Sequence, residues 1–416
     1  MTRRASLAVA IAALGAVATL PAQSRLDSWV TTWTTAQMLV APAGPPRPAR
    51  QKGPEASNLP ASFADQTVRM VTHVSVGGRR IRVELSNMVG GQPLEIGAAH
   101  VAIHKGAGDL VEGTDRTLTF GGSATFTIPP GAIVASDPVD LELAPLSELA
   151  VSLYLPRDTG APANHNVGLH TAYISKGNVV ASQNMPEAAT MRAYVWLSAV
   201  DVVAPSDAST VVALGDSITD GFATTPDANM AWPTLLAKRM KENKATQYVA
   251  VVNQGISGNQ VLRDGAGISA LARLDRDVLT RPGVKWVILL EGINDINIRT
   301  RPNGPNPLTA EELIWGYRQI IERCHAQGIK VIGATLTPAE GVPTYAALGE
   351  EIRVAVNRWI RTKGNFDALV DLDAAVRDPQ RPATLKEEFD SGDHIHPNDK
   401  GNQAMADAFD LGVFKK

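Results

Sequence analysis

The sequence predicts two fold classes in succession: an all-β sandwich, then an α/β domain with a central parallel five-stranded sheet. From about Arg25 to Ala204, short β-branched apolar runs alternate with glycine and proline, and long helical periodicity is missing. From Thr210 onward, apolar runs alternate with amphipathic helical patterns, which is typical of a parallel sheet covered on both faces. The length of 416 residues also favours two domains.

The N-terminus, residues 1–24, is predicted to be a secretory signal peptide. Two arginines precede an apolar, alanine-rich run over residues 5–20, and small residues follow it. Cleavage is expected after Ser24 or after Ala22. The alternative is a membrane anchor, but the run is short for a helix that crosses a bilayer, which needs about 20 residues. We therefore expect a secreted or periplasmic mature protein without stable membrane insertion.

Residues 25–204 are expected to form the β-sandwich domain. A strand at 67–74, two glycines at 77–78 and a second strand at 80–85 indicate a β-hairpin. The proline-rich stretch 41–54 is expected to be a surface loop. Further short strands are expected at 99–103, 124–128, 139–143, 149–155 and 171–174.

Residues 205–416 are expected to form the α/β domain, after a linker at 203–209. Its predicted strands span 210–214, 248–253, 285–290, 329–335 and 368–372. Its predicted helices span 232–242, 268–279, 309–327, 345–361 and 400–409.

Composition excludes several classes of function. A formal net charge of −3 gives no reason to expect a nucleic-acid partner. The single cysteine, Cys324, excludes an intramolecular disulfide, and its place in a helical pattern predicts a small buried side chain. No spacing of cysteine and histidine resembles a zinc site, so no metal is expected.

The loops after the predicted strands are the candidates for a site, because ligands of such a sheet bind outside the carboxyl ends of the strands. After the strand at 210–214 the chain reads Gly215-Asp216-Ser217. A serine between a strand end and a helix can expose its hydroxyl beside backbone N–H groups that stabilise an oxyanion. Taken alone, this segment is equally consistent with an ordinary turn.

Two further loops carry groups that suit an oxyanion. Gly255 and Gly258, after the strand at 248–253, permit close approach of the backbone to a ligand. Asn294, after the strand at 285–290, offers a side-chain N–H. Each has a structural alternative, which is a turn for the glycines and an Asx turn or helix cap for the asparagine.

The last loop offers a carboxylate and an imidazole three residues apart, Asp393 and His396. In a turn the carboxylate can accept the imidazole Nδ1–H, fix the tautomer and leave Nε2 facing a nucleophile. The alternative is a helix cap with an incidental histidine. His394 is a poor partner for Asp393 because neighbours along the chain do not face one another, and Asp390 lies six residues before His396.

The combination of Ser, Gly, Asn and Asp-x-x-His on one edge of the predicted sheet resembles the SGNH (GDSL-type) hydrolase family, in its two-domain secreted form. The resemblance covers about residues 211–409 and implies a flavodoxin-like three-layer fold for that region. Ile218 is a minor departure, because the family usually has leucine there.

Position by position, the resemblance implies that Ser217 is the nucleophile, His396 the general base and Asp393 its orienting acid. It implies an oxyanion hole made of the backbone N–H groups of Ser217 and Gly258 and the side chain of Asn294. It implies neither a metal nor an organic cofactor.

The expected function is a serine esterase that hydrolyses short acyl esters, acetyl esters included, through an acyl-enzyme. Within that class a lipase or lysophospholipase and a carbohydrate O-deacetylase remain alternatives. A non-catalytic glycan-binding protein is the alternative from another class. A nucleotide-binding protein is disfavoured, because no G-x-G-x-x-G follows the first strand of the sheet. The expected partner is a small-molecule or glycan ester.

Overall fold

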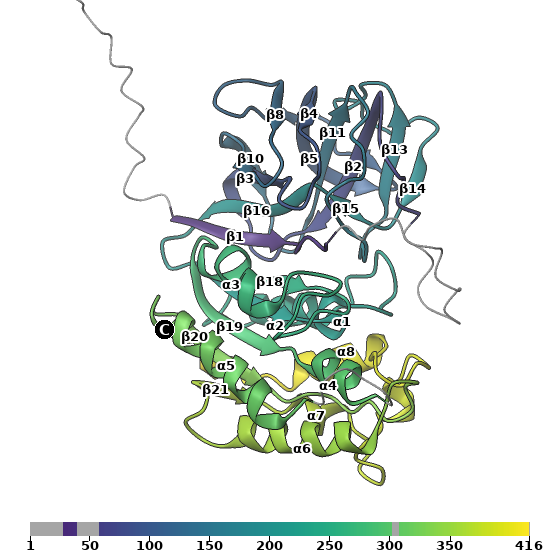
Figure 1. Cartoon of the computed structure of the whole chain (residues 1–416). Coiled ribbons are helices and arrows are strands. Elements are labelled where there is room, and N and C mark those ends of the chain that lie inside the picture. Colours follow the sequence, from purple (N-terminus) through teal and green to yellow (C-terminus); the bar gives the residue numbers. More distant parts are fainter. Residues whose placement is uncertain (1–27, 40–57, 302–307, 416) are drawn as a thin grey trace, which may run out of the picture.

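A computed structural model describes residues 28–39, 58–301 and 308–415. Figure 1 shows a strand-rich half, built from residues 28–39 and 58–204, lying against an α/β half. The predicted signal peptide and the proline-rich stretch 41–54 lie outside the described residues.

The strand-rich half contains two antiparallel sheets. The first has the order β1-β16-β3-β10, with β9 also paired to β3: β1 (Ser28–Thr34), β3 (Gly78–Ser86), β9 (Ile133–Ala135), β10 (Val139–Leu143) and β16 (Leu197–Ala204). The second has the order β14-β13-β2-β11-β5-β6, with β7 paired to β5: β2 (Gln66–His73), β5 (Ala98–Gly106), β6 (Asp109–Leu110), β7 (Arg116–Thr117), β11 (Glu148–Leu155), β13 (Ala172–Lys176) and β14 (Ala189–Met191). Two short pairs complete it: β4 (Leu94–Ile96) with β8 (Phe126–Ile128), and β12 (Asn164–His165) with β15 (Tyr194–Val195).

Both sheets contribute to one hydrophobic core. Val83 of β3 and Val151 of β11 come from different sheets, and both are fully buried in it. Strand β3 alternates buried and partly exposed residues, as expected for a strand with one face on a core. The region is therefore rich in strands, as the sequence predicts.

The predicted hairpin between the strands at 67–74 and 80–85 is wrong. Strand β2 pairs with β11 and β13, whereas β3 pairs with β16, β10 and β9 in the other sheet. Buried Val74 and Val76 mark a crossing between the sheets rather than a turn. Gly77 is needed for a close approach, because a Cβ there would lie 2.1 Å from the carbonyl oxygen of Leu143.

The α/β half is built on a five-stranded parallel sheet, as predicted. Its order is β18-β17-β19-β20-β21, with β17 (Ser209–Gly215), β18 (Val249–Gly255), β19 (Val284–Leu290), β20 (Lys330–Ala334) and β21 (Ala368–Val370). Numbered within the sheet this is the order 2-1-3-4-5 of flavodoxin-like folds.

Eight α-helices are described in this half: α1 (Ser217–Asp220), α2 (Trp232–Glu242), α3 (Ala270–Leu274), α4 (Ile293–Thr300), α5 (Ala310–His325), α6 (Ala347–Arg361), α7 (Leu372–Val376) and α8 (Asp399–Asp407). Two short 3₁₀ helices span Glu387–Phe389 and Leu411–Phe414. The predicted helix at 268–279 is broken, because α3 runs into a π-helical turn at Asp275–Leu279.

The sheet order places the helices on both faces. The chain moves from β17 to β18 in one direction and from β18 to β19 in the other, so right-handed crossovers put α2 and α3 on opposite faces. Helix α8 packs on α2, and α5 packs on α3 and α6. None of the helices within the described ranges is both long enough and apolar enough to cross a membrane.

Strand β1 joins the two halves (Figure 1). It pairs with β16 in the first sheet and also contacts β17 and β18 of the parallel sheet. The backbone N–H of Thr31 donates to the carbonyl of Pro282 at 3.0 Å, and the hydroxyl of Thr210 donates to the carbonyl of Thr31 at 3.0 Å. Buried Ser75 adds a contact, since its hydroxyl accepts from the backbone N–H of Val251 at 2.8 Å.

Candidate active site

The sheet order places three predicted site loops side by side, because β17 lies between β18 and β19. The last residues of these strands stand in register. The segments that follow them carry Ser217 at the start of α1, Gly258 in a loop and Asn294 at the start of α4, at the edge where open parallel sheets bind ligands.

Ser217, His396 and Asp393 form a continuous chain of hydrogen bonds. Nε2 of His396 lies 2.7 Å from Oγ of Ser217, and Nδ1 lies 2.5 Å from Oδ2 of Asp393. Ser217 is 6% exposed and the side chain of His396 is 13% exposed. The hydroxyl and the imidazole are therefore largely shielded from bulk water.

The loop itself holds the carboxylate of Asp393 in place. Oδ1 accepts from the backbone N–H groups of Ile395 at 3.2 Å and His396 at 2.9 Å, which leaves Oδ2 for the imidazole. Burial opposes ionisation of this carboxyl. The hydrogen bond and charge of His396, together with the two backbone N–H groups, outweigh burial and hold the pKa of Asp393 well below its usual range.

A second histidine–aspartate pair lies on the same loop. Nδ1 of His394 lies 2.7 Å from Oδ2 of Asp390, and the backbone N–H of His394 donates to Oδ1 of Asp390 at 3.0 Å. The sequence did not predict this pair. The two aspartates therefore have different partners: Asp390 binds the imidazole of His394, and Asp393 binds that of His396.

Ser217 begins the short helix α1, which directly follows β17. The side chain of Asp216 caps this helix by accepting from the backbone N–H of Ile218 at 3.0 Å. The N–H of Asp220 closes the turn by donating to the carbonyl of Asp216, and Gly221 ends it with a φ of +95°. The serine is therefore fixed at a tight strand-to-helix junction.

Gly258, on the loop after β18, and Asn294, in the first turn of α4, lie on segments that touch each other. Gly258 has a φ of +82°, in the left-handed region that favours glycine. Nδ2 of Asn294 donates to the carbonyl of Asn259, the next residue, at 3.0 Å. An amide nitrogen carries two hydrogens, so one donor of Asn294 remains for a ligand.

Asp295, next to Asn294, binds the loop that follows β18. Its two carboxylate oxygens accept from the backbone N–H groups of Val261 at 2.8 Å and Leu262 at 3.0 Å. Burial raises the pKa of Asp295 to about 6, against the effect of these two hydrogen bonds. Helix α4 and the Gly258 loop are therefore held together by two neighbouring side chains.

Buried Arg273 links the carboxyl ends of strands β17 and β18. It donates to the carbonyls of Gly215 at 3.0 Å and Gln254 at 2.7 Å, and to Oδ1 of Asn259 at 2.9 Å. Its Nη2 also lies 3.7 Å from fully buried Glu291. Burial and the charge of Asp216 raise the pKa of Glu291 well above its usual range, against the charge of Arg273.

Three further residues at the site were not predicted from the sequence. Phe222 lies on His396, with ring centroids 4.4 Å apart. Asp220 and Arg273 are buried charged side chains. Buried charges are rare without a partner, but burial is visible only in the structure, so the sequence carried no signal that marked them.

Within the described parts of the chain, no group of three or more His, Cys, Asp or Glu side chains is arranged to hold a metal ion. Cys324 is buried, as predicted, and burial raises the pKa of its thiol to about 12.

Comparison with solved structures gives several matches. They include a lipolytic protein of the G-D-S-L family from Desulfitobacterium hafniense DCB-2, at 23% identity over 48% of this chain and 97% of that chain, with a TM-score of 0.37. A carbohydrate acetylesterase from Sinorhizobium meliloti has 16% identity over 48% and 95%, with a TM-score of 0.38. A catalytic mutant of an acetylxylan esterase from Geobacillus stearothermophilus has 23% identity over 49% and 93%, with a TM-score of 0.38.

Among curated proteins, none matches the chain. The sequence does match a family model, described as the GDSL-like Lipase/Acylhydrolase family, over residues 213–404. The match includes the loops of Ser217, Gly258 and Asn294 and the loop of Asp393 and His396. Residues 213–404 of this chain are therefore a domain of the GDSL-like lipase/acylhydrolase family.

Proposed function

We propose that this protein is a serine esterase that hydrolyses short acyl esters through an acyl-enzyme intermediate. The observation that carries the proposal is the unbroken chain from the Ser217 hydroxyl through His396 to Asp393, with bonds of 2.7 and 2.5 Å. A hydroxyl, an imidazole and a carboxylate in this order are the groups that nucleophilic acyl transfer needs.

In the first half of the reaction Oγ of Ser217 attacks the ester carbonyl carbon, and Nε2 of His396 takes the hydroxyl proton. The carbonyl oxygen becomes an oxyanion, which accepts from the backbone N–H groups of Ser217 and Gly258 and from Nδ2 of Asn294. Each such donor can stabilise the transition state by about 3 kcal/mol.

In the second half His396 gives its proton to the leaving alkoxide, and the C–O bond breaks to leave the acyl group on Ser217. Asp393 stabilises the imidazolium between these steps and holds its ring by the Nδ1–H bond. Water then attacks the acyl-enzyme, with His396 again acting as base, and releases the acid. The cycle uses no cofactor.

We propose a small-molecule or glycan ester as the substrate. Aromatic residues make up 5% of the chain, and no long apolar segment suited to a lid is evident in the sequence, which favours short acyl groups over long lipid chains. A lipase or lysophospholipase and a carbohydrate O-deacetylase are the finer alternatives. A purely glycan-binding role is disfavoured by the complete set of catalytic groups.

We also propose a two-domain organisation. Residues 25–204 would form a β-sandwich domain and residues 205–416 the catalytic domain. Strand β16 ends at Ala204 and β17 begins at Ser209, which supports a boundary between them. The leader pattern at 1–24 supports export to the periplasm or the medium.

The test uses the full mature protein and chromogenic esters of increasing acyl length, together with acetylated polysaccharides. We expect turnover of the shortest esters without added metal and without inhibition by a chelator. The matched control is Ser217→Ala, which removes one hydroxyl and should abolish turnover while leaving the circular dichroism spectrum unchanged. Absence of esterase activity in folded wild-type protein, or near-normal turnover in Ser217→Ala, would contradict the proposal.

A further inference from the structure

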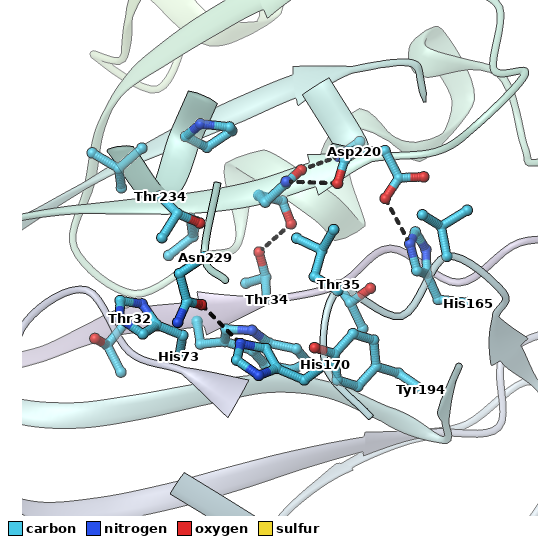
Figure 2. A pocket seen from close by; sticks show the side chains of 18 residues that line it. Thr32, Thr34, Thr35, His73, His165, His170, Tyr194, Asp220, Asn229 and Thr234 are labelled. Atoms are coloured by element: carbon cyan, nitrogen blue, oxygen red, sulfur yellow. Dashed lines mark hydrogen bonds and ion pairs between the residues drawn. The ribbon is translucent and has the colours of Figure 1, made fainter. Parts of the chain in front are cut away.

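A buried histidine of the strand-rich half contacts the nucleophile helix of the other half. His165 lies in β12 and is 2% exposed. Its Nε2 lies 2.9 Å from Oδ1 of Asp220, the last residue of α1. Figure 2 shows this contact at one side of a cavity between the two halves, near Tyr194.

The second ring nitrogen of His165 fixes its protonation. Nδ1 lies 2.7 Å from the carbonyl oxygen of Ala36, which can only accept, so Nδ1 must carry a proton. A carboxylate is also an acceptor, so the ring satisfies both partners when it is an imidazolium. Burial opposes that charge. The charge and hydrogen bond of Asp220 and the bond to Ala36 outweigh it and raise the pKa of His165, although Arg273 acts in the opposite direction.

Asp220 connects this imidazole to the loop of Gly258. Its Oδ2 accepts from the backbone N–H of Ser257 at 2.9 Å and from the Ser257 hydroxyl at 2.7 Å. Asp220 is itself 3% exposed, so its charge depends on partners rather than on water. One carboxylate therefore connects the helix that begins at Ser217 to the residue that precedes Gly258.

We propose that His165 is a positioning residue, which holds Asp220 so that α1 and the Ser257–Gly258 segment keep the spacing that an oxyanion needs. The inference rests on the proposed function, because it assigns a spacing to the proposed oxyanion donors. It makes the strand-rich half part of the active-site framework. A misplacement of about 1 Å in such a framework can cost about a hundredfold in rate.

The matched control for this inference is His170. It is buried in the same half and lines the same cavity, but its Nε2 faces Oδ1 of Asn229 at 2.8 Å (Figure 2). A glutamine at either position removes one imidazole from the cavity. Only the change at His165 removes the imidazole that contacts Asp220.

The experiment measures kcat and KM for a short chromogenic ester with His165→Gln and His170→Gln in the full mature protein. Rates are taken well below the melting temperature of each variant, so that a loss of stability alone does not lower kcat. We expect kcat to fall about tenfold or more in His165→Gln with KM within about twofold, because oxyanion donors act mainly in the transition state. We expect His170→Gln to stay within about twofold of wild type. Unchanged kcat in folded His165→Gln, or an equal loss in His170→Gln, would overturn the inference.

Ser257→Ala provides a second test, which remains decisive if His165→Gln does not fold. It removes one of the two bonds from Ser257 to Asp220 on a partly exposed loop, and we expect kcat to fall about threefold with KM unchanged. No change in kcat would mean that Asp220 does not hold this loop. If wild type is active, Ser217→Ala inactive and His165→Gln and Ser257→Ala normal, this inference fails alone. If wild type has no esterase activity, the proposed function fails and the inference fails with it.

Discussion

Two histidines, one from each half of the molecule, each hold an aspartate at one ring nitrogen and differ in what the other nitrogen meets. His396, on the last loop, meets the hydroxyl of Ser217, which can both donate and accept. His165, in the strand-rich half, meets a backbone carbonyl, which can only accept. The side chains are 13% and 3% exposed.

This difference separates a reacting group from a structural one. An imidazole that faces a hydroxyl can accept its proton and return it, so His396 suits the role of a base. An imidazole that faces a carbonyl and a carboxylate must keep both protons, so His165 suits the role of a fixed cation. A histidine–aspartate contact alone therefore does not identify a catalytic pair. The group that faces the other ring nitrogen distinguishes the two roles.

The largest expected effect comes from replacing His396, the histidine that faces a hydroxyl. His396→Ala removes the only imidazole that contacts Ser217 among the described residues, so we expect kcat/KM to fall by about 10⁴-fold or more, as in Ser217→Ala. Initial rates with the best short ester measure this. The double variant, His396→Ala with Ser217→Ala, should have the same kcat/KM as either single variant, because triad members act as a unit. A variant that keeps about a tenth of wild-type activity would contradict the role of base.

Asp393→Asn should have the next largest effect. The amide cannot balance the imidazolium and can favour the wrong tautomer, so we expect a loss of about 10³-fold, smaller than in His396→Ala. Stability gives an independent measurement. The native pKa of Asp393 is depressed, so its ionised form stabilises the fold above the unfolded pKa of about 4, and this contribution is lost as the pH falls further.

The gap in melting temperature between wild type and Asp393→Asn should therefore narrow as the pH falls from 6 toward 3. A constant gap would mean that the charge of Asp393 contributes nothing to stability.

Asn294→Ala tests the oxyanion side and should cost about 10²-fold in kcat with little change in KM. The donor is used mainly when negative charge develops, so the loss should appear in the chemical step. Steady-state kinetics with one short ester separate the two constants. The variant also loses the bond to Asn259, so its melting temperature is the control for local disorder. A loss confined to KM would mean that Asn294 binds the ground-state ester instead.

Much of the α/β half could be predicted from sequence because periodicity alone encodes it. The five strands and the helix at 232–242 were predicted, and the parallel sheet is confirmed. Short helix α4 was not predicted, because eight residues with few apolar positions carry little periodic signal. The π-helical turn at Asp275–Leu279 was also missed, since it follows an uninterrupted helical pattern.

The strand-rich half shows where local patterns fail. Adjacent strands with two glycines between them predicted a hairpin, but β2 and β3 belong to different sheets. Pairing of strands distant in sequence depends on packing that no short window contains. The contact of His165 with Asp220 was missed for the same reason, since 55 residues separate two partners that only the tertiary fold brings together.

The smallest expected effect concerns His394, which shares its loop with His396. Its imidazole is 53% exposed and is bound to Asp390, and its backbone has a φ of +69°. Asparagine tolerates this left-handed conformation better than alanine does, so His394→Asn removes the imidazole with less backbone strain. We expect His394→Asn to keep kcat/KM within about threefold of wild type, and His394→Ala to lose somewhat more through the loop. The two variants together separate the imidazole from the backbone. A loss in His394→Asn as large as in His396→Ala would move the base by two residues and make His394–Asp390 the catalytic pair.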